Sequence, residues 1–180
     1  MTTFGLYLSL GFDHISDLAG YDHILFLVAL CAVYSIRDWK RVLILVTAFT
    51  TGHTLTLALA TLNLVPVPGD LIEFLIPVTI FITGLWNVVR AGDRSAASQR
   101  FKYGTALFFG LIHGMGFSYY LRSLLGMEEG ILMPLFSFNV GLEIGQVMIV
   151  IIVLLISFLL VDVLIVICKC IKATILGPLE

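Results

Sequence analysis

The feature that most constrains the fold is the last apolar stretch of the chain, Ile131–Ile167, in which Glu143 and Asp162 are the only charged residues. A helix that crosses a bilayer needs roughly twenty mainly apolar residues, so this stretch is longer than one straight crossing. It predicts a long tilted helix, or a short re-entrant piece followed by a helix. Hydrophobic residues make up 59% of the chain and charged residues only 12%, which is typical of integral membrane proteins. We therefore expect an all-α integral membrane protein with a single transmembrane domain over residues 1–180.

Shorter apolar segments precede this stretch and predict further helices. The predicted spans are Tyr21–Ile36, Val42–Leu64, Leu71–Val89 and Phe101–Leu121. Thr3–Phe12 is also apolar, but its length of about ten residues is half of what a crossing needs. We predict a short interfacial or re-entrant helix there. The expected architecture is a bundle of five transmembrane helices, with six as the alternative if the N-terminal piece also crosses.

The placement of lysine and arginine predicts the orientation of this bundle. With five spans, nine of the ten basic residues fall on one side of the membrane and only Arg122 falls on the other. Loops rich in basic residues stay in the cytoplasm. We therefore expect a multi-pass protein of the plasma (inner) membrane, with its N-terminus outside and its C-terminus in the cytoplasm.

A polar segment, Gly11–His23, precedes the first predicted span and holds two histidines and three aspartates in thirteen residues. We expect it at the outer mouth of the bundle, where it would gather a cation. His14, Asp22 and His23 offer imidazole and carboxylate groups, which are ligands of divalent transition metals in proteins. Asp17 lies between them and is either a supporting group or a solvated charge.

Three further ionisable residues, His53, His113 and Glu143, lie near the middle of three different predicted spans. An ionisable group at mid-bilayer is costly unless it is partnered, and it usually marks the path of an ion or proton. A single polar centre that contains all three would meet this requirement. Each histidine alone also fits ordinary packing, for example with a hydrogen bond to Thr50.

These residues predict two sites for a divalent transition-metal ion, an outer capture site and a mid-membrane site formed by His53, His113 and Glu143. The identity of the ion (nickel, cobalt or zinc) stays open. The predicted ligands are His14, Asp22, His23, His53, His113 and Glu143. Asn139, Glu143 and Gln146 follow i, i+4, i+7 spacing and share one helix face. The polar residues expected around the ligands are Asp17, Thr50, Asn139 and Gln146.

Four blocks of sequence, in this order, resemble the HupE/UreJ family of membrane proteins. They are GYDHILFL, TAFTTGHTLTLA, FFGLIHGMGFS and FNVGLEIGQ. The resemblance covers nearly the whole chain. It implies a small permease associated with nickel or cobalt uptake for hydrogenase and urease maturation. It also implies an outer motif formed by His14, Asp22 and His23, and it marks His53, His113 and Glu143.

We therefore expect a permease for a divalent transition-metal ion and not an enzyme. One alternative is an intramembrane zinc-dependent hydrolase, in which the same ligands would hold zinc with an activated water and Glu143 would act as general base. The chain has no HExxH motif, which disfavours this reading. Another alternative is an accessory protein or sensor that binds metal without transporting it. The expected partners are the lipid bilayer and the metal ion. The net charge of -2 gives no indication of nucleic-acid binding, and a homo-oligomer stays open.

Overall fold

The structure is a computed structural model that describes residues 2–65, 68–93, 95–125 and 130–164. These residues form helices and no strand, which confirms the prediction of an all-helical protein. The α-helices are α1 (Thr3–Ser16), α2 (Asp22–Cys31), α3 (Trp39–Thr61), α4 (Gly69–Val89), α5 (Ala96–Gly116), α6 (Ser118–Leu125) and α7 (Leu132–Ser157). A 3₁₀ turn (Ile36–Asp38) precedes α3, and a π-helical turn (Phe158–Val163) follows α7. Ile167, the predicted end of the last apolar stretch, lies outside the described residues.

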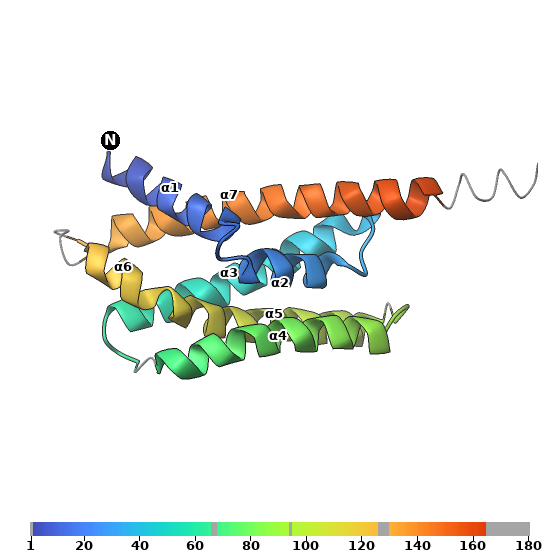
Figure 1. Ribbon diagram of the computed structural model, residues 1–180, viewed down its shortest axis with the longest axis horizontal. Helices are drawn as coiled ribbons and strands as arrows, with labels where there is room; N and C mark the ends of the chain where they lie inside the picture. Colours follow the sequence, from blue (N-terminus) through green and yellow to red (C-terminus); the bar gives the residue numbers. More distant parts are fainter. Residues whose placement is uncertain (1, 66–67, 94, 126–129, 165–180) are drawn as a thin grey trace, which may run out of the picture.

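In the described part of the chain, three helical stretches are long and apolar enough to cross a membrane by themselves. They cover Ile36–Thr61, Gly69–Val89 and Leu132–Leu160. In Figure 1, α4 and α7 run along the bundle in one direction and α3 runs in the other. Large apolar side chains on these helices, such as Phe74, Phe81 and Leu132, are exposed. Because lipid is a better solvent than water for such side chains, this surface is that of a membrane protein.

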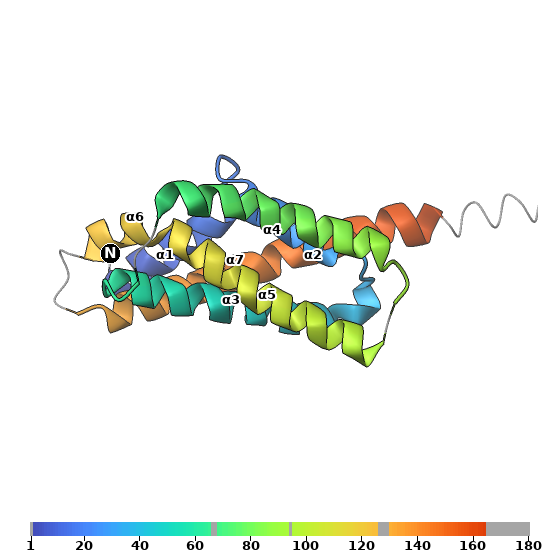
Figure 2. The ribbon, with the colours of Figure 1, turned by 90° about the horizontal axis from the view of Figure 1, so that it is seen from below.

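The remaining helices follow one another in pairs along the bundle. α1 and α2 run in one direction, and α5 and α6 run in the other (Figures 1 and 2). The expected helix bounds at the N-terminus are wrong. α1 does not stop at Phe12 as an interfacial helix but continues to Ser16 alongside α7, and α2 ends at Cys31. The polar segment Gly11–His23 therefore lies partway along the bundle and not at its outer mouth.

Close packing of α1 against α7, at a glycine in each helix, explains why α1 lies inside the bundle. A Cβ atom on Gly11 would overlap the carbonyl oxygen of Phe138 in α7, and one on Gly141 would overlap the carbonyl oxygen of Leu8 in α1. The two backbones can touch only because these positions carry no side chain, as is common between membrane helices. Packing of this kind depends on two helices together, so the apolar pattern of α1 alone does not indicate it.

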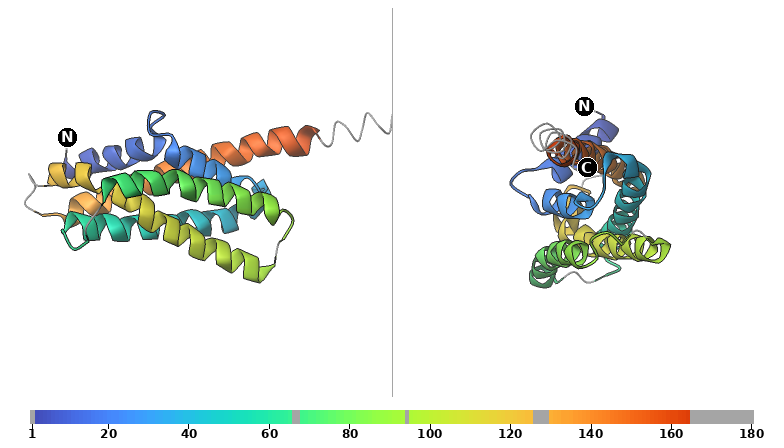
Figure 3. Two further views of the ribbon diagram at one scale, coloured as in Figure 1. Left: turned by 60° about the horizontal axis from the view of Figure 1, so that its bottom comes forward. Right: turned by 90° about the vertical axis from the view of Figure 1, so that its right-hand side faces the viewer.

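A second pair of helices, α3 and α5, is packed in the same way. Cβ atoms on Gly52, Gly110 and Gly114 would overlap carbonyl oxygens of the partner helix. Viewed along the bundle in Figure 3, α1 and α7 lie on one side, α4 and α5 on the opposite side, and α2 and α3 between them. The centre of the bundle is thus enclosed by two glycine-packed helix pairs and by α2 and α4.

Basic residues gather at one end of this bundle. α3 and α5 begin, and α4 ends, at the right-hand end in Figure 1. The basic residues of these helix ends and their connections are Arg37, Lys40, Arg41, Arg90, Arg100 and Lys102. Arg94, Lys169 and Lys172 lie outside the described residues.

Candidate metal centre

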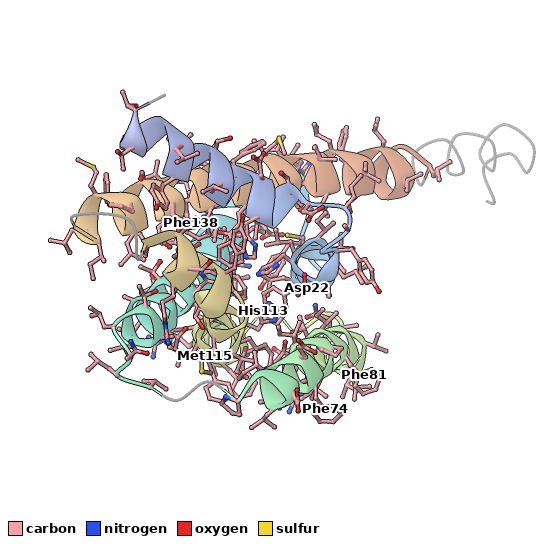
Figure 4. The ribbon with its side chains drawn as sticks, turned by 60° about the vertical axis from the view of Figure 1, so that its left-hand side comes forward. Asp22, Phe74, Phe81, His113, Met115 and Phe138 are labelled. Atoms are coloured by element: carbon pink, nitrogen blue, oxygen red, sulfur yellow. The ribbon has the colours of Figure 1, made fainter. Side chains whose placement is uncertain are left out.

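Four histidines and one aspartate from four helices meet in the middle of the bundle. His14 lies near the end of α1, Asp22 and His23 begin α2, His53 lies in α3 and His113 in α5. The ring centroid of His23 lies 4.7 Å from that of His14, 6.0 Å from that of His53 and 5.2 Å from that of His113. In Figure 4, His113 lies in the interior and Asp22 lies at the start of α2, whereas Phe74 and Phe81 of α4 lie on the outside.

The ligand atoms of this cluster fall into two groups of three. In the first group, one nitrogen each from His14, His23 and His53 lie within 4.8 Å of one another. In the second group, a carboxylate oxygen of Asp22 and one nitrogen each from His23 and His113 meet the same limit. Atoms that bind one ion at about 2 Å are at most about 4 Å apart, so either group needs only a small contraction to bind a metal.

Three of the four histidine side chains are buried, and several histidine nitrogens lack a hydrogen-bond partner among the described residues. His23, His53 and His113 are 4%, 0% and 1% exposed. Among the described residues, no hydrogen-bond partner exists for Nε2 of His14 and His23, for both nitrogens of His53, or for Nδ1 of His113. A buried polar atom without a partner is unfavourable by about 1–3 kcal/mol. Several such nitrogens in one place fit the binding of a cation that takes imidazole ligands.

The break between α1 and α2 brings His14 and His23 together. Asp17 follows the last turn of α1, and its side chain accepts a hydrogen bond from the backbone N–H of Ala19 at 2.8 Å, which stabilises the turn. Asp22 begins α2, where the helix dipole favours a carboxylate. Its Oδ1 accepts a hydrogen bond from the His23 backbone N–H at 2.9 Å and lies 3.2 Å from His23 Nδ1. Asp22 thereby orients the His23 ring.

Thr79 of α4 sets the proton on His113. The Thr79 hydroxyl lies 2.7 Å from the Ile76 carbonyl oxygen and 2.9 Å from His113 Nε2. A hydroxyl has a single hydrogen, and the carbonyl oxygen can only accept it. With the hydroxyl donating to the Ile76 carbonyl oxygen, the Thr79 oxygen accepts a hydrogen bond from His113 Nε2–H. This leaves His113 Nδ1, which has no partner among the described residues, with its lone pair free to bind a metal.

Three phenylalanines form a layer on one side of the cluster. Phe26 follows His23 by one helical turn, and Phe49 and Phe109 each precede a histidine by one turn. Because α2 runs opposite to α3 and α5, all three rings lie toward the end of the bundle where the basic residues gather. Phe26 and Phe49 stack with centroids 4.7 Å apart and are 0% and 1% exposed. We call Phe26, Phe49 and Phe109 the aromatic layer; it closes this side of the cluster.

The other side of the cluster borders two open depressions. The first is lined by Asp13, His14, Asp17 and Tyr120, among others. The second is lined by Asp22 and by Glu73 and Pro77 of α4, among others. Both depressions offer carboxylates, which attract cations, and each ends at one member of the metal cluster.

Glu143 lies on a different seam of the bundle, between α3 and α7. Its Oε1 accepts a hydrogen bond from the Thr47 hydroxyl at 2.9 Å. Three of the polar residues expected near the ligands, Thr50, Asn139 and Gln146, lie on the same two helices. The Thr50 hydroxyl donates to Gln146 at 2.6 Å, and the Thr54 hydroxyl donates to Asn139. Neither described group of metal-ligating atoms includes Glu143, and its role as a ligand stays a prediction.

The structure thus brings together His14, Asp22, His23, His53 and His113. Sequence reasoning missed Thr79 and the aromatic layer. No pattern in α4 marks Thr79, because its role depends on how α4 faces α5. The aromatic layer could have been predicted from the sequence, because a phenylalanine lies one helical turn from each of three histidines.

Comparison with known proteins identifies the family. A family model described as "HupE / UreJ protein" matches residues 1–176. Comparison with the curated proteins and with solved structures gives no match. The matched region includes every residue of the histidine cluster and all the described helices. The chain belongs to the HupE/UreJ family.

Proposed function

We propose that this protein is a membrane permease for a divalent transition-metal ion, nickel or cobalt in the first instance. The observation that carries the proposal is the meeting of four histidines and Asp22, from four helices, at the centre of the bundle. Neutral imidazole and carboxylate groups are ligands for nickel, cobalt and zinc. The association of the HupE/UreJ family with nickel or cobalt uptake supports the choice of substrate.

The helix arrangement supports a bundle that crosses the membrane five times. α1 has 14 residues and α2 has 10, and neither reaches the roughly twenty that a crossing needs. Taken end to end they make one crossing, as do α5 and α6, beside α3, α4 and α7. The basic end of the bundle then lies in the cytoplasm, the N-terminus lies outside, and the aromatic layer lies on the cytoplasmic side of the metal cluster.

This orientation suggests a route for the ion. The ion would approach from outside through the depressions that contain Asp13, Asp17 and Glu73. There it would exchange its bound water molecules for histidine nitrogens. Breaks in transmembrane helices at mid-depth are where many transporters bind their ions. To leave toward the cytoplasm, the ion must pass the aromatic layer, so Phe26 and Phe49 have to part.

The donor set favours transport over the hydrolase alternative. A catalytic zinc site keeps three protein ligands and an open position for water. Here two groups of donors overlap, which offers an ion more than one position. Glu143, the general base of the hydrolase alternative, is hydrogen-bonded to Thr47 on another seam. The overlapping groups support a path for the ion, and the distant position of Glu143 removes the general base that the hydrolase would need.

The test measures metal binding and flux on the same preparation. The protein is purified in detergent, its nickel, cobalt and zinc contents are measured by elemental analysis, and uptake is followed in proteoliposomes. We expect His23→Ala to lose both binding and flux, because His23 belongs to both groups. Tyr21→Phe is the matched control, because Tyr21 is exposed and lies two residues away. Binding that survives His23→Ala, or wild-type protein that binds metal without flux, would overturn the proposal.

A further inference from the structure

The two groups of ligand atoms share one residue, and this carries an inference that rests on the proposed function. We propose that the first group (His14, His23, His53) and the second group (Asp22, His23, His113) are alternative positions for a single ion. The ion passes from one position to the other by exchanging ligands around His23. His23 is a ligand in both positions, through a different nitrogen in each, while His14 and His53 are replaced by Asp22 and His113, or the reverse.

We assign the two nitrogens of His23 to different groups, Nδ1 to the second and Nε2 to the first. Nδ1 lies 3.2 Å from Asp22 Oδ1, whereas Nε2 is buried and has no hydrogen-bond partner among the described residues. A neutral imidazole carries one N–H and one free lone pair, so it binds one ion at a time. Occupation of the first position through Nε2 therefore excludes occupation of the second through Nδ1.

Asp22 has a different role in each position. With the ion in the first position, the Asp22 carboxylate accepts a hydrogen bond from His23 Nδ1–H, which orients the ring and strengthens its Nε2 as a ligand. With the ion in the second position, Asp22 binds the ion itself. The move therefore converts His23 from its Nδ1–H tautomer to its Nε2–H tautomer, with no net gain or loss of a proton, so the ring stays neutral.

The two positions also differ in their surroundings. His14 lines the depression that contains Asp13 and Asp17, whereas Asp22 lines the depression that contains Glu73. Each position thus borders its own opening. The second position is the more organised, because Thr79 fixes His113, whereas neither nitrogen of His53 has a partner among the described residues. It also offers a carboxylate, which offsets part of the ion's charge.

Selective removal of each position tests the proposal, with Ni²⁺ alone as the probe. His53→Ala removes only the first position, His113→Ala only the second, and His23→Ala removes both. We expect wild-type protein to bind one ion per chain. Each of the first two variants should still bind one ion, weakened by about 10–100-fold at most, whereas His23→Ala should bind none in the same range. X-ray absorption should detect a carboxylate ligand in His53→Ala and only nitrogen ligands in His113→Ala.

Three results would overturn the two-position arrangement. They are two ions per wild-type chain, loss of all binding in either His53→Ala or His113→Ala, or a ligand set in these variants that does not differ. If alanine prevents folding, judged by gel filtration, glutamine at the same position replaces it.

Flux separates this proposal from the proposed function. Both His53→Ala and His113→Ala should bind nickel and lose uptake in proteoliposomes, because the exchange needs both positions. Uptake that persists in either variant would refute the exchange even if the wild type transports. Absence of uptake in the wild type would refute the permease, while the binding and absorption results would still decide whether two positions exist.

Discussion

Gly114 of α5 lies so close to His53 of α3 that a methyl group on Gly114 would overlap the His53 carbonyl oxygen. Gly114 directly follows His113, so this contact fixes the separation of two histidines of the candidate metal centre. The same contact extends along both helices through Gly52 and Gly110. The geometry of the metal centre is therefore set by backbone packing and not only by the histidine side chains.

Gly114→Ala should push α5 away from α3 and separate His113 from His53. Introducing a methyl group into such a tight contact costs about 1–3 kcal/mol. We expect a lower Tm in detergent together with weaker nickel binding by titration calorimetry. Gly104→Ala is the matched control in the same helix, because a Cβ there meets nothing within 4 Å. Replacing a helical glycine by alanine at an open position stabilises by about 0.5–1 kcal/mol, so a destabilised Gly104→Ala would contradict this account.

Gly11→Ala should disturb the first metal position and spare the second. A Cβ on Gly11 would overlap the Phe138 carbonyl oxygen of α7, so the substitution displaces α1. His14 is the metal-ligating residue that α1 contributes, whereas Asp22, His23 and His113 come from other helices. Nickel should therefore bind with a carboxylate ligand detectable by X-ray absorption. Gly5→Ala serves as control, because its Cβ would meet only the Thr2 hydroxyl at an ordinary 3.4 Å. If nickel is bound by nitrogen ligands alone in Gly11→Ala, the prediction that the second position is spared is wrong.

Thr79→Val should weaken metal binding without changing any ligand. The substitution keeps the shape of the side chain but removes the acceptor that holds the proton on His113 Nε2. Loss of such an orienting hydrogen bond typically lowers metal affinity about 10–100-fold. The measurement is the nickel dissociation constant in detergent. Thr83→Val is the matched control one turn along α4, because its hydroxyl donates only to the Thr79 carbonyl oxygen. Equal effects of the two substitutions would show that Thr79 only stabilises α4 and does not orient His113.

The sequence alone predicts the all-helical class and most residues of the histidine cluster. Apolar runs interrupted by charged loops predict helices, and the cost of burying a histidine in lipid indicates a shared centre. These arguments predicted a shared centre for His53 and His113, and they depend on composition and depth alone. Asp22 and His23 were predicted from their ligand chemistry and from the family resemblance, at the outer mouth and not in this centre.

The position of Glu143 and the roles of α1 and α2 could not be predicted, because they depend on which helix faces meet. Glu143 was placed at the same depth as the histidines, and depth alone does not distinguish the seam with Thr47 from the centre of the bundle. The half-length helices α1 and α2 were misjudged for a related reason. Hydropathy measures whether a segment is long enough to cross alone, whereas α1 is held inside the bundle by its close contacts with α7 at Gly11 and Gly141.

Glu143→Gln decides whether Glu143 takes part in metal binding. Its Oε1 accepts a hydrogen bond from Thr47, and a glutamine oxygen can accept the same bond. We expect the nickel dissociation constant to change less than about twofold, which is under 0.5 kcal/mol. Asp22→Asn is the comparison at a predicted ligand and should lose the carboxylate signal in X-ray absorption. A loss of binding in Glu143→Gln as large as in His23→Ala would place Glu143 among the ligands.

Phe49→Ala should open the aromatic layer and allow metal to leak. Phe49 stacks on Phe26 and is 1% exposed, so truncation leaves a cavity between the metal cluster and the basic end of the bundle. A cavity of this size costs about 3–5 kcal/mol in a protein core, and we expect a lower Tm. The informative measurement is passive efflux of nickel from loaded proteoliposomes, which should be faster than with the wild type. Phe81→Ala is the control, because Phe81 is 68% exposed. If Phe49→Ala lowers the Tm while efflux stays at the wild-type rate, the ion leaves by another route and the aromatic layer serves only packing.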